Sequence, residues 1–221
     1  MESGHHIISI SLGGSANPTG LAVVEPRSEY WYPKGNESEL DSENHFGVFW
    51  LERVPAGRSY PAIVSRVREL KATQQVSRDC SVLVDITRTG AAPLKLFEAK
   101  GIDVEPVEVT DGADATYQNG VHHLPRRDMI GAAQVALQSN RLKVSSGLEL
   151  APTLITDLQA FDPALTGRAA ETAQIDDLVA AVAVAVWWGE RLQWCDEVAE
   201  SMLPEDDWPD PHDGRNEQTG Y

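Results

Sequence analysis

The chain has 221 residues, of which 42% are hydrophobic, and this composition is sufficient for one domain with a buried core. The formal net charge is −16, and half of it comes from the segment after Trp194, which holds nine Asp or Glu and one Arg. Such a balance excludes the overall positive field of a strong nucleic-acid binder, so contact with nucleic acid would need a local basic patch, a metal site or a partner.

The first part of the chain predicts an antiparallel sheet of three strands. Ile7–Leu12 alternates apolar and polar residues and is the first expected strand, and the turn Gly13–Gly20 leads into a second strand over Leu21–Glu25. We interpret the polar segment Arg27–Glu43 as a long loop. His45–Val54 is the third expected strand.

An alternation of helices and strands follows. Tyr60–Lys71 has apolar residues at helical spacing. Cys80–Gly90 begins as an apolar run typical of a strand buried on both faces, which ends at Asp85 before a polar turn. Ala91–Lys100 is an expected helix. Ile102–Val109 breaks strict alternation and contains proline, so we expect an edge strand.

The second half of the chain is predicted to be mainly helical. A polar loop is expected over Asp111–Gly120, followed by helices over Pro125–Leu142, Leu148–Phe161 and Ile175–Trp194. The last of these is apolar on all sides at its centre, so we expect it to be deeply buried against the sheet.

We predict one domain over residues 1–194 and a flexible acidic tail over residues 195–221. Two distant cysteines, Cys80 and Cys195, provide neither a disulfide framework nor zinc-finger spacing. The longest apolar run, Leu178–Trp188, is too short to cross a bilayer, and residues 1–6 lack the features of a signal peptide. We therefore expect a cytoplasmic protein without membrane contact.

The candidate site residues are carboxylates at the expected sheet edge. Asp85 ends a buried strand, and in α/β proteins ligands collect at that end of the sheet. Asp176 and Asp177 stand at the start of the last helix, where they could cap the helix or approach Asp85. Carboxylates gathered there from distant parts of a chain can bind two divalent cations for phosphodiester hydrolysis.

Five segments, in order, resemble the nuclease domain of bacteriophage terminase large subunits, which belongs to the ribonuclease H-like nucleases. They are Ile8–Glu25, Leu51–Leu70, Val82–Gly90, Leu124–Val144 and Asp176–Ala183. The resemblance implies an α/β ribonuclease H-like fold, in which a central mixed sheet with an antiparallel three-strand start continues in parallel strands and is flanked by helices.

The resemblance also implies a metal-dependent DNA endonuclease that acts during phage DNA packaging in the bacterial host. It implies that Asp85, Asp177 and Asp176 are catalytic and hold Mg²⁺ or Mn²⁺. DNA would be the substrate, and a packaging ATPase or another phage protein would be the partner. The 221 residues contain no Gly-rich phosphate loop ending in Gly-Lys-Ser/Thr. Arg126 and Arg127 are candidate phosphate contacts, although such residues are more often a solvated helix face.

One departure from the family pattern bears directly on activity. Such nucleases have an aspartate at the end of the first strand, where this chain has Ser11. A neutral hydroxyl is a weak Mg²⁺ ligand, so Ser11 marks a vacant-ligand position and could impair cleavage. A catalytically inactive ribonuclease H-like binding or assembly module is therefore the alternative. A relative of sugar kinases or actin-like ATPases is a third hypothesis, disfavoured because those proteins are much longer. We interpret the pair His122-His123 as a surface feature.

Overall fold

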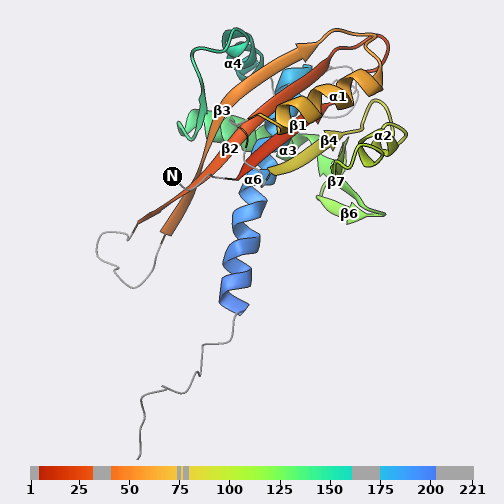
Figure 1. Cartoon of the computed structure of the whole chain (residues 1–221). Helices are drawn as coiled ribbons and strands as arrows, with labels where there is room; N and C mark the ends of the chain where they lie inside the picture. Colours follow the sequence, from red (N-terminus) through yellow and green to blue (C-terminus); the bar gives the residue numbers. More distant parts are fainter. Residues whose placement is uncertain (1–4, 32–40, 74–75, 77–79, 161–174, 203–221) are drawn as a thin grey trace, which may run out of the picture.

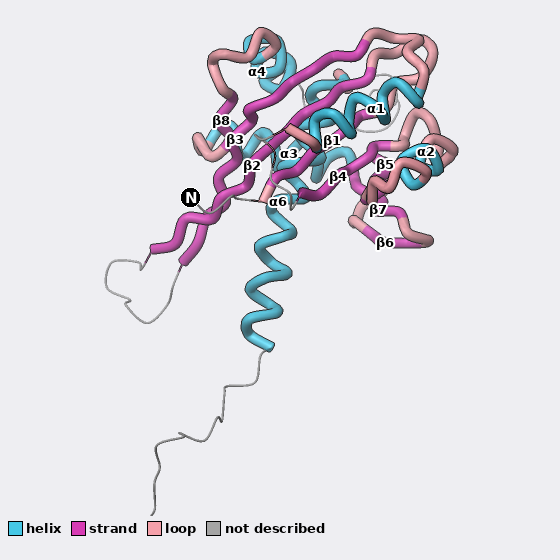
Figure 2. The backbone as a smooth tube through the Cα atoms, in the orientation of Figure 1, coloured by secondary structure: helices cyan, strands magenta, loops and turns pink. Residues whose placement is uncertain are grey.

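A mixed sheet of eight strands, in the order β6-β7-β5-β4-β1-β2-β3-β8, runs through the part of the protein that the structure describes (Figures 1 and 2). The computed structural model describes residues 5–31, 41–73, 76, 80–160 and 175–202. The strands are β1 (His6–Ser11), β2 (Thr19–Trp31), β3 (Asp41–Val54), β4 (Cys80–Asp85), β5 (Glu105–Thr110), β6 (Thr116–Gln118), β7 (Val121–Pro125) and β8 (Leu142–Val144). The helices are α1 (Tyr60–Lys71), α2 (Leu94–Glu98), α3 (Arg126–Gln138), α4 (Ala151–Ala160) and α6 (Asp177–Met202).

Helices cover both faces of this sheet and create two hydrophobic cores. Successive residues of a strand point to opposite faces, so β1 contributes Ile8 to the core beneath α1 and Ile7 to the core beneath α6. Helices α1 and α2 pack on one face, and α3, α4 and α6 pack on the other (Figure 1). The face covered by α6 is the one that carries the candidate site.

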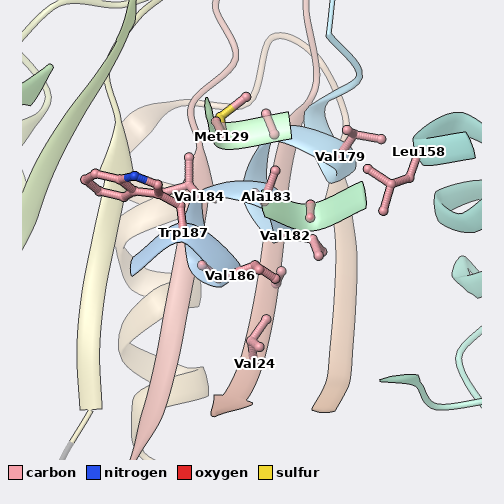
Figure 3. Close-up of a cluster of buried hydrophobic side chains, with 14 of the residues drawn as sticks. Val24, Met129, Leu158, Val179, Val182, Ala183, Val184, Val186 and Trp187 are labelled. Carbon is pink, nitrogen blue, oxygen red and sulfur yellow. The ribbon is translucent and has the colours of Figure 1, made fainter. Parts of the chain in front are cut away.

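Helix α6 is the central element of its layer. Every residue from Leu178 to Val186 is buried, and most are alanine or valine. These small side chains let α6 lie close to the strands, as Figure 3 shows where α6 valines pack near Val24 and Met129. Among the described residues, no helix is both long enough and apolar enough to cross a membrane.

The strand directions confirm the predicted mixed sheet. Strands β1, β2 and β3 pair antiparallel, and β4 and β5 continue from β1 in parallel. Helix α1 spans Tyr60–Lys71, as its periodicity predicts, and the buried strand that ends at Asp85 is β4. A parallel strand beside β1 brings the end of β4 next to the end of β1, which assembles the site.

The hairpin of β2 and β3 is longer than the sequence predicts. The segment 27–43, which we expected to be a loop, continues the pairing on both sides, because β2 extends to Trp31 and β3 begins at Asp41. Its polar residues are compatible with a ribbon that projects beyond the sheet body (Figure 1). Residues 32–40 lie outside the described part of the chain.

The prediction of an edge strand over Ile102–Val109 is wrong. Strand β5 begins at Glu105 and lies between β4 and β7. The expected loop over Asp111–Gly120 contains β6, which forms a hairpin with β7 and provides the edge of the sheet. The helix expected over Ala91–Lys100 is only the short α2.

The long helix predicted to reach Leu142 ends earlier. Asn140 adopts a left-handed conformation with φ 62°, which stops α3, and Leu142 begins β8 beside β3. At the other end of the chain, α6 continues to Met202, so the predicted boundary between domain and tail at residue 195 falls inside a helix. The segment between the predicted helices Leu148–Phe161 and Ile175–Trp194 lies outside the described residues from residue 161 to residue 174, as does the tail from residue 203 onward.

Candidate functional site

The candidate site is a row of four residues across the sheet. Ser11, the last residue of β1, pairs with Asp85 of β4 on one side and with Gly20 of β2 on the other. Gly20 in turn pairs with Arg53 of β3. Because paired residues point to the same face, and Leu83 of β4 belongs to the core under α6, the whole row faces α6.

Asp85 is buried and its carboxylate is held by three hydrogen bonds. Ser11 Oγ donates to Asp85 Oδ2 at 3.0 Å, and both the backbone N and the Oγ1 of Thr87 donate to Asp85 Oδ1, at 2.9 and 2.5 Å. Thr87 Oγ1 also accepts from the backbone N of Val109 at 2.7 Å, which fixes the turn after β4 to β5. The buried carboxylate is therefore satisfied by protein donors alone.

Gly20 allows the start of α6 to rest directly on the sheet. A Cβ atom on Gly20 would lie 2.2 Å from the carbonyl oxygen of Asp177, a distance that real side chains do not reach. Only glycine therefore permits this approach at this position. The close contact places Asp177 above the row, near Arg53 and on the same face as Asp85.

Arg53 binds both aspartates at the start of α6. Its Nη2 lies 2.7 and 2.6 Å from the two carboxylate oxygens of Asp176, and its Nε lies 3.0 and 3.1 Å from the two oxygens of Asp177. Asp176 also caps the helix, because its Oδ1 accepts from the backbone N of Leu178 at 2.9 Å. Burial raises the pKa of Asp177, and the charge of Asp176 raises it further, whereas Arg53 favours the ionised form.

The structure brings some predicted site residues together and leaves others apart. Ser11 and Asp85 are in contact, and Asp176 and Asp177 share Arg53, but Asp177 stands over Gly20, two strands from Asp85. Neighbouring strands are about 4.8 Å apart, so the backbones of Asp85 and Gly20 are separated by about 10 Å. Two catalytic metal ions about 4 Å apart require carboxylates that reach both ions.

This donor set does not fit a centre for two metal ions. Ser11 contributes a neutral hydroxyl, Asp85 already accepts three hydrogen bonds from protein donors, and Asp177 is ion-paired with Arg53. In the described part of the chain, no three His, Cys, Asp or Glu side chains are grouped closely enough to hold a metal ion.

Two hollows flank Arg53. One, of about 300 Å³, is lined by Arg53, Arg88, Asp176, Asp177 and neighbouring residues. The other, of about 280 Å³, is lined by Arg53, Arg58, Arg66 and neighbouring residues. Arg88 donates to the carbonyl oxygen of Ile175 at 2.5 Å, and the Arg58 residue is exposed. Within the described residues, neither Arg58 nor Arg88 is paired with a carboxylate.

The other predicted contacts lie elsewhere. Arg126 and Arg127 begin α3, and their Nε atoms lie 3.4 Å from Asp111 and 3.0 Å from Asp128. The pair His122-His123, which we interpreted as a surface feature, belongs to β7, and His122 lies 3.5 Å from Glu105.

Sequence reasoning missed Gly20 and Arg53. Both lie in segments that resemble the terminase nuclease domain, Ile8–Glu25 and Leu51–Leu70, but only the register of the β2–β3 hairpin shows that they share a row with Ser11.

The fold is shared with known nuclease domains. No protein-family model matches this sequence, and neither does any curated protein. Two solved structures of the large terminase nuclease from thermophilic phage G20c, one with bound zinc, each align with a TM-score of 0.50 and 17% sequence identity. Each covers 81% of this chain, which corresponds to 78% of the zinc-bound structure and 80% of the other. The chain therefore has the ribonuclease H-like fold of large terminase nuclease domains, as the ordered segments of its sequence predict.

Proposed function

We propose that this protein is a non-catalytic module of terminase nuclease type, which binds DNA or a packaging component in the cytoplasm of a phage-infected bacterium. The observation that carries this proposal is the hydrogen bond from Ser11 to Asp85. At this position the resemblance implies a metal-binding carboxylate. Here the residue is Ser11, and its neutral hydroxyl donates a hydrogen bond to Asp85, the one candidate site carboxylate on a strand. A packaging ATPase or another phage protein is the expected protein partner.

Charge considerations favour a local contact with DNA. The net charge of −16 opposes binding over a broad surface, since nucleic-acid affinity comes largely from phosphate neutralisation. The hollows beside the row nevertheless contain Arg58 and Arg88, neither of which forms an ion pair with a described carboxylate, although Asp176 and Asp177 line the hollow of Arg88, and Glu52 and Glu69 line that of Arg58. Arg126 and Arg127 remain predicted contacts, but each has an acidic partner that reduces its attraction for phosphate. We therefore expect binding that weakens with salt, with a slope of log K against log[salt] of about −2 for two phosphate contacts.

The decisive experiment combines cleavage and binding. Plasmid and single-stranded DNA are incubated with the wild-type protein and Mn²⁺ or Mg²⁺, beside Asp85→Ala as the control. Binding to the same DNA is measured at increasing salt in EDTA, for the wild type and for the Arg58→Gln/Arg88→Gln double variant. We expect no cleavage, salt-sensitive binding, and weaker binding by the double variant. Cleavage by the wild type that disappears in Asp85→Ala would overturn the non-catalytic proposal.

The second candidate is a metal-dependent DNA endonuclease that uses Mg²⁺ or Mn²⁺ with an incomplete ligand set. It is favoured by the position of Asp85 and Asp177, which face the same layer at the same end of the sheet. The cleavage arm of the experiment separates the two candidates, because only this one requires a cut that depends on both Asp85 and a divalent cation.

A further inference from the structure

Two carboxylates and one guanidinium meet above the row that contains the carboxyl end of β1. Asp177 is buried, with only 3% of the residue exposed, and Asp176 is adjacent to it. Two neighbouring carboxylates, one of them buried, are costly unless a cation balances them. In the described part of the protein, that cation is the guanidinium of Arg53, which contacts all four of their carboxylate oxygens.

We propose that Arg53 stands in place of a metal ion, so that the candidate site is a metal-independent structural ion pair. Arg53 reaches the aspartates because it is in register with Gly20, the residue on which Asp177 rests. The guanidinium is planar and permanently charged, and it satisfies several carboxylate oxygens at once. It therefore offsets one of the two carboxylate charges and satisfies the oxygens of both, which is part of the role that a divalent cation performs in a carboxylate cluster.

The serine at position 11 is consistent with a site in which Arg53 takes the place of a metal ion. If an aspartate stood at position 11, it would lie in register with Asp85, and two buried carboxylates would face each other with no cation between them. With serine, Asp85 is the one carboxylate of the row, and three hydrogen bonds satisfy it. The change at position 11 and the ion pair of Arg53 both remove the need for a metal ion.

The test is the response of thermal unfolding to divalent cations, which is independent of any DNA readout. The wild type, Arg53→Met and Arg66→Met are unfolded in EDTA and in increasing Mg²⁺ or Mn²⁺ at constant ionic strength. Arg66 is a matched control, because it also binds two acidic residues, Glu52 and Glu69, but belongs to α1 on the opposite face of the sheet from α6. Mn²⁺ binding to the wild type is measured in parallel by isothermal titration calorimetry.

We expect no saturable cation effect on the wild type. We expect a lower Tm for Arg53→Met that divalent cations partly restore, by about 4 °C at ten times the Kd. Arg66→Met should gain no such dependence. Saturable Mn²⁺ binding by the wild type that Asp177→Asn abolishes would overturn the inference. This arm remains informative even if Arg53→Met does not fold.

The inference deepens the proposed function of the same site, but the two can fail separately. Metal binding without DNA cleavage would refute the role of Arg53 and leave a non-catalytic module. DNA cleavage that depends on Asp85 would refute the proposed function itself.

Discussion

Gly20 lies directly beneath the backbone of Asp177, so closely that an added Cβ would be 2.2 Å from the Asp177 carbonyl oxygen. This contact determines how near the first turn of α6 comes to the sheet. It also determines that Asp177 faces Arg53. The position of a predicted site residue thus depends on the absence of a side chain on a neighbouring strand.

Gly20→Ala should therefore be strongly destabilising. The backbone of α6 would have to move away from β2, and overpacking of this kind costs about 3 kcal/mol of unfolding free energy. Urea unfolding measures the loss. Gly14→Ala is the matched control, because a Cβ there meets nothing within 4 Å, and we expect a change within about 0.5 kcal/mol. Equal stability of the two variants would contradict the close contact.

Ser11→Ala should destabilise the protein by about 1 to 3 kcal/mol, because the buried carboxylate of Asp85 loses one of its donors. Chemical unfolding checks this value. Ser65→Ala serves as the control, since the Ser65 hydroxyl bonds the Pro61 carbonyl on an exposed helix surface, and its loss should cost less than about 0.5 kcal/mol. A Ser11→Ala variant as stable as the wild type would show that the hydrogen bond contributes little.

Ser11→Asp should make the protein respond to divalent cations. The new carboxylate would lie beside Asp85, so we expect a lower Tm in EDTA and a rise in Tm on addition of Mn²⁺. The same variant is then tested for DNA cleavage. A gain of Mn²⁺-dependent cleavage would show that the missing first carboxylate alone separates this chain from an active nuclease.

If Ser11→Asp neither binds Mn²⁺ nor cuts DNA, the double variant Ser11→Asp/Arg53→Met becomes the informative protein. It has a carboxylate at position 11 and releases Asp177 from its ion pair. If Mn²⁺ raises the Tm of the double variant but not that of Ser11→Asp, the ion pair of Arg53 with Asp177 is what prevents metal binding in Ser11→Asp.

His122 should make stability depend on pH. Its ring packs 4.5 Å from that of Tyr117 and 5.0 Å from that of Trp188, measured between centroids. Burial lowers the pKa of His122 below its usual 6.5, although Glu105 opposes this shift, and Arg191 lowers the pKa further. In the pH range between the lowered pKa and 6.5, the unfolded chain binds a proton that the folded protein does not, so stability falls as pH decreases through this range.

Urea unfolding at pH 7.5 and 5.5 tests the role of His122. We expect the loss of stability at the lower pH to be smaller in His122→Phe than in the wild type, because phenylalanine keeps the ring contacts without the titration. The same loss in both proteins would assign the pH dependence to other groups.

The sequence predicted those parts of the fold whose signals are local. The helical spacing of Tyr60–Lys71 defines α1, and the apolar run before Asp85 defines β4. The alanine and valine centre of α6 predicted its burial, because a helix that is apolar on all sides is stable only in the interior. These elements can be predicted without knowing which other elements pack against them.

The short strands were missed because their stability comes from distant partners. Thr116–Gln118 and Leu142–Val144 are too short to show a period, and each becomes a strand only by pairing with β7 or β3. The strand Glu105–Thr110 was expected at an edge, since its proline removes a donor, yet β7 pairs with it on the side away from β4.

By itself, the sequence determined which residues could carry chemistry: Asp85 at the end of a buried strand, Asp176 and Asp177 at a helix start, and a serine where the resemblance to terminase nucleases implies an aspartate. Only the tertiary structure decided what those residues do with one another. The hairpin register sets Arg53 beside Gly20, and Gly20 admits the backbone of Asp177. The physical reason is that a charge is balanced by whatever lies within a few ångströms, and residues distant in the chain become neighbours only through the pairing of strands and the packing of α6.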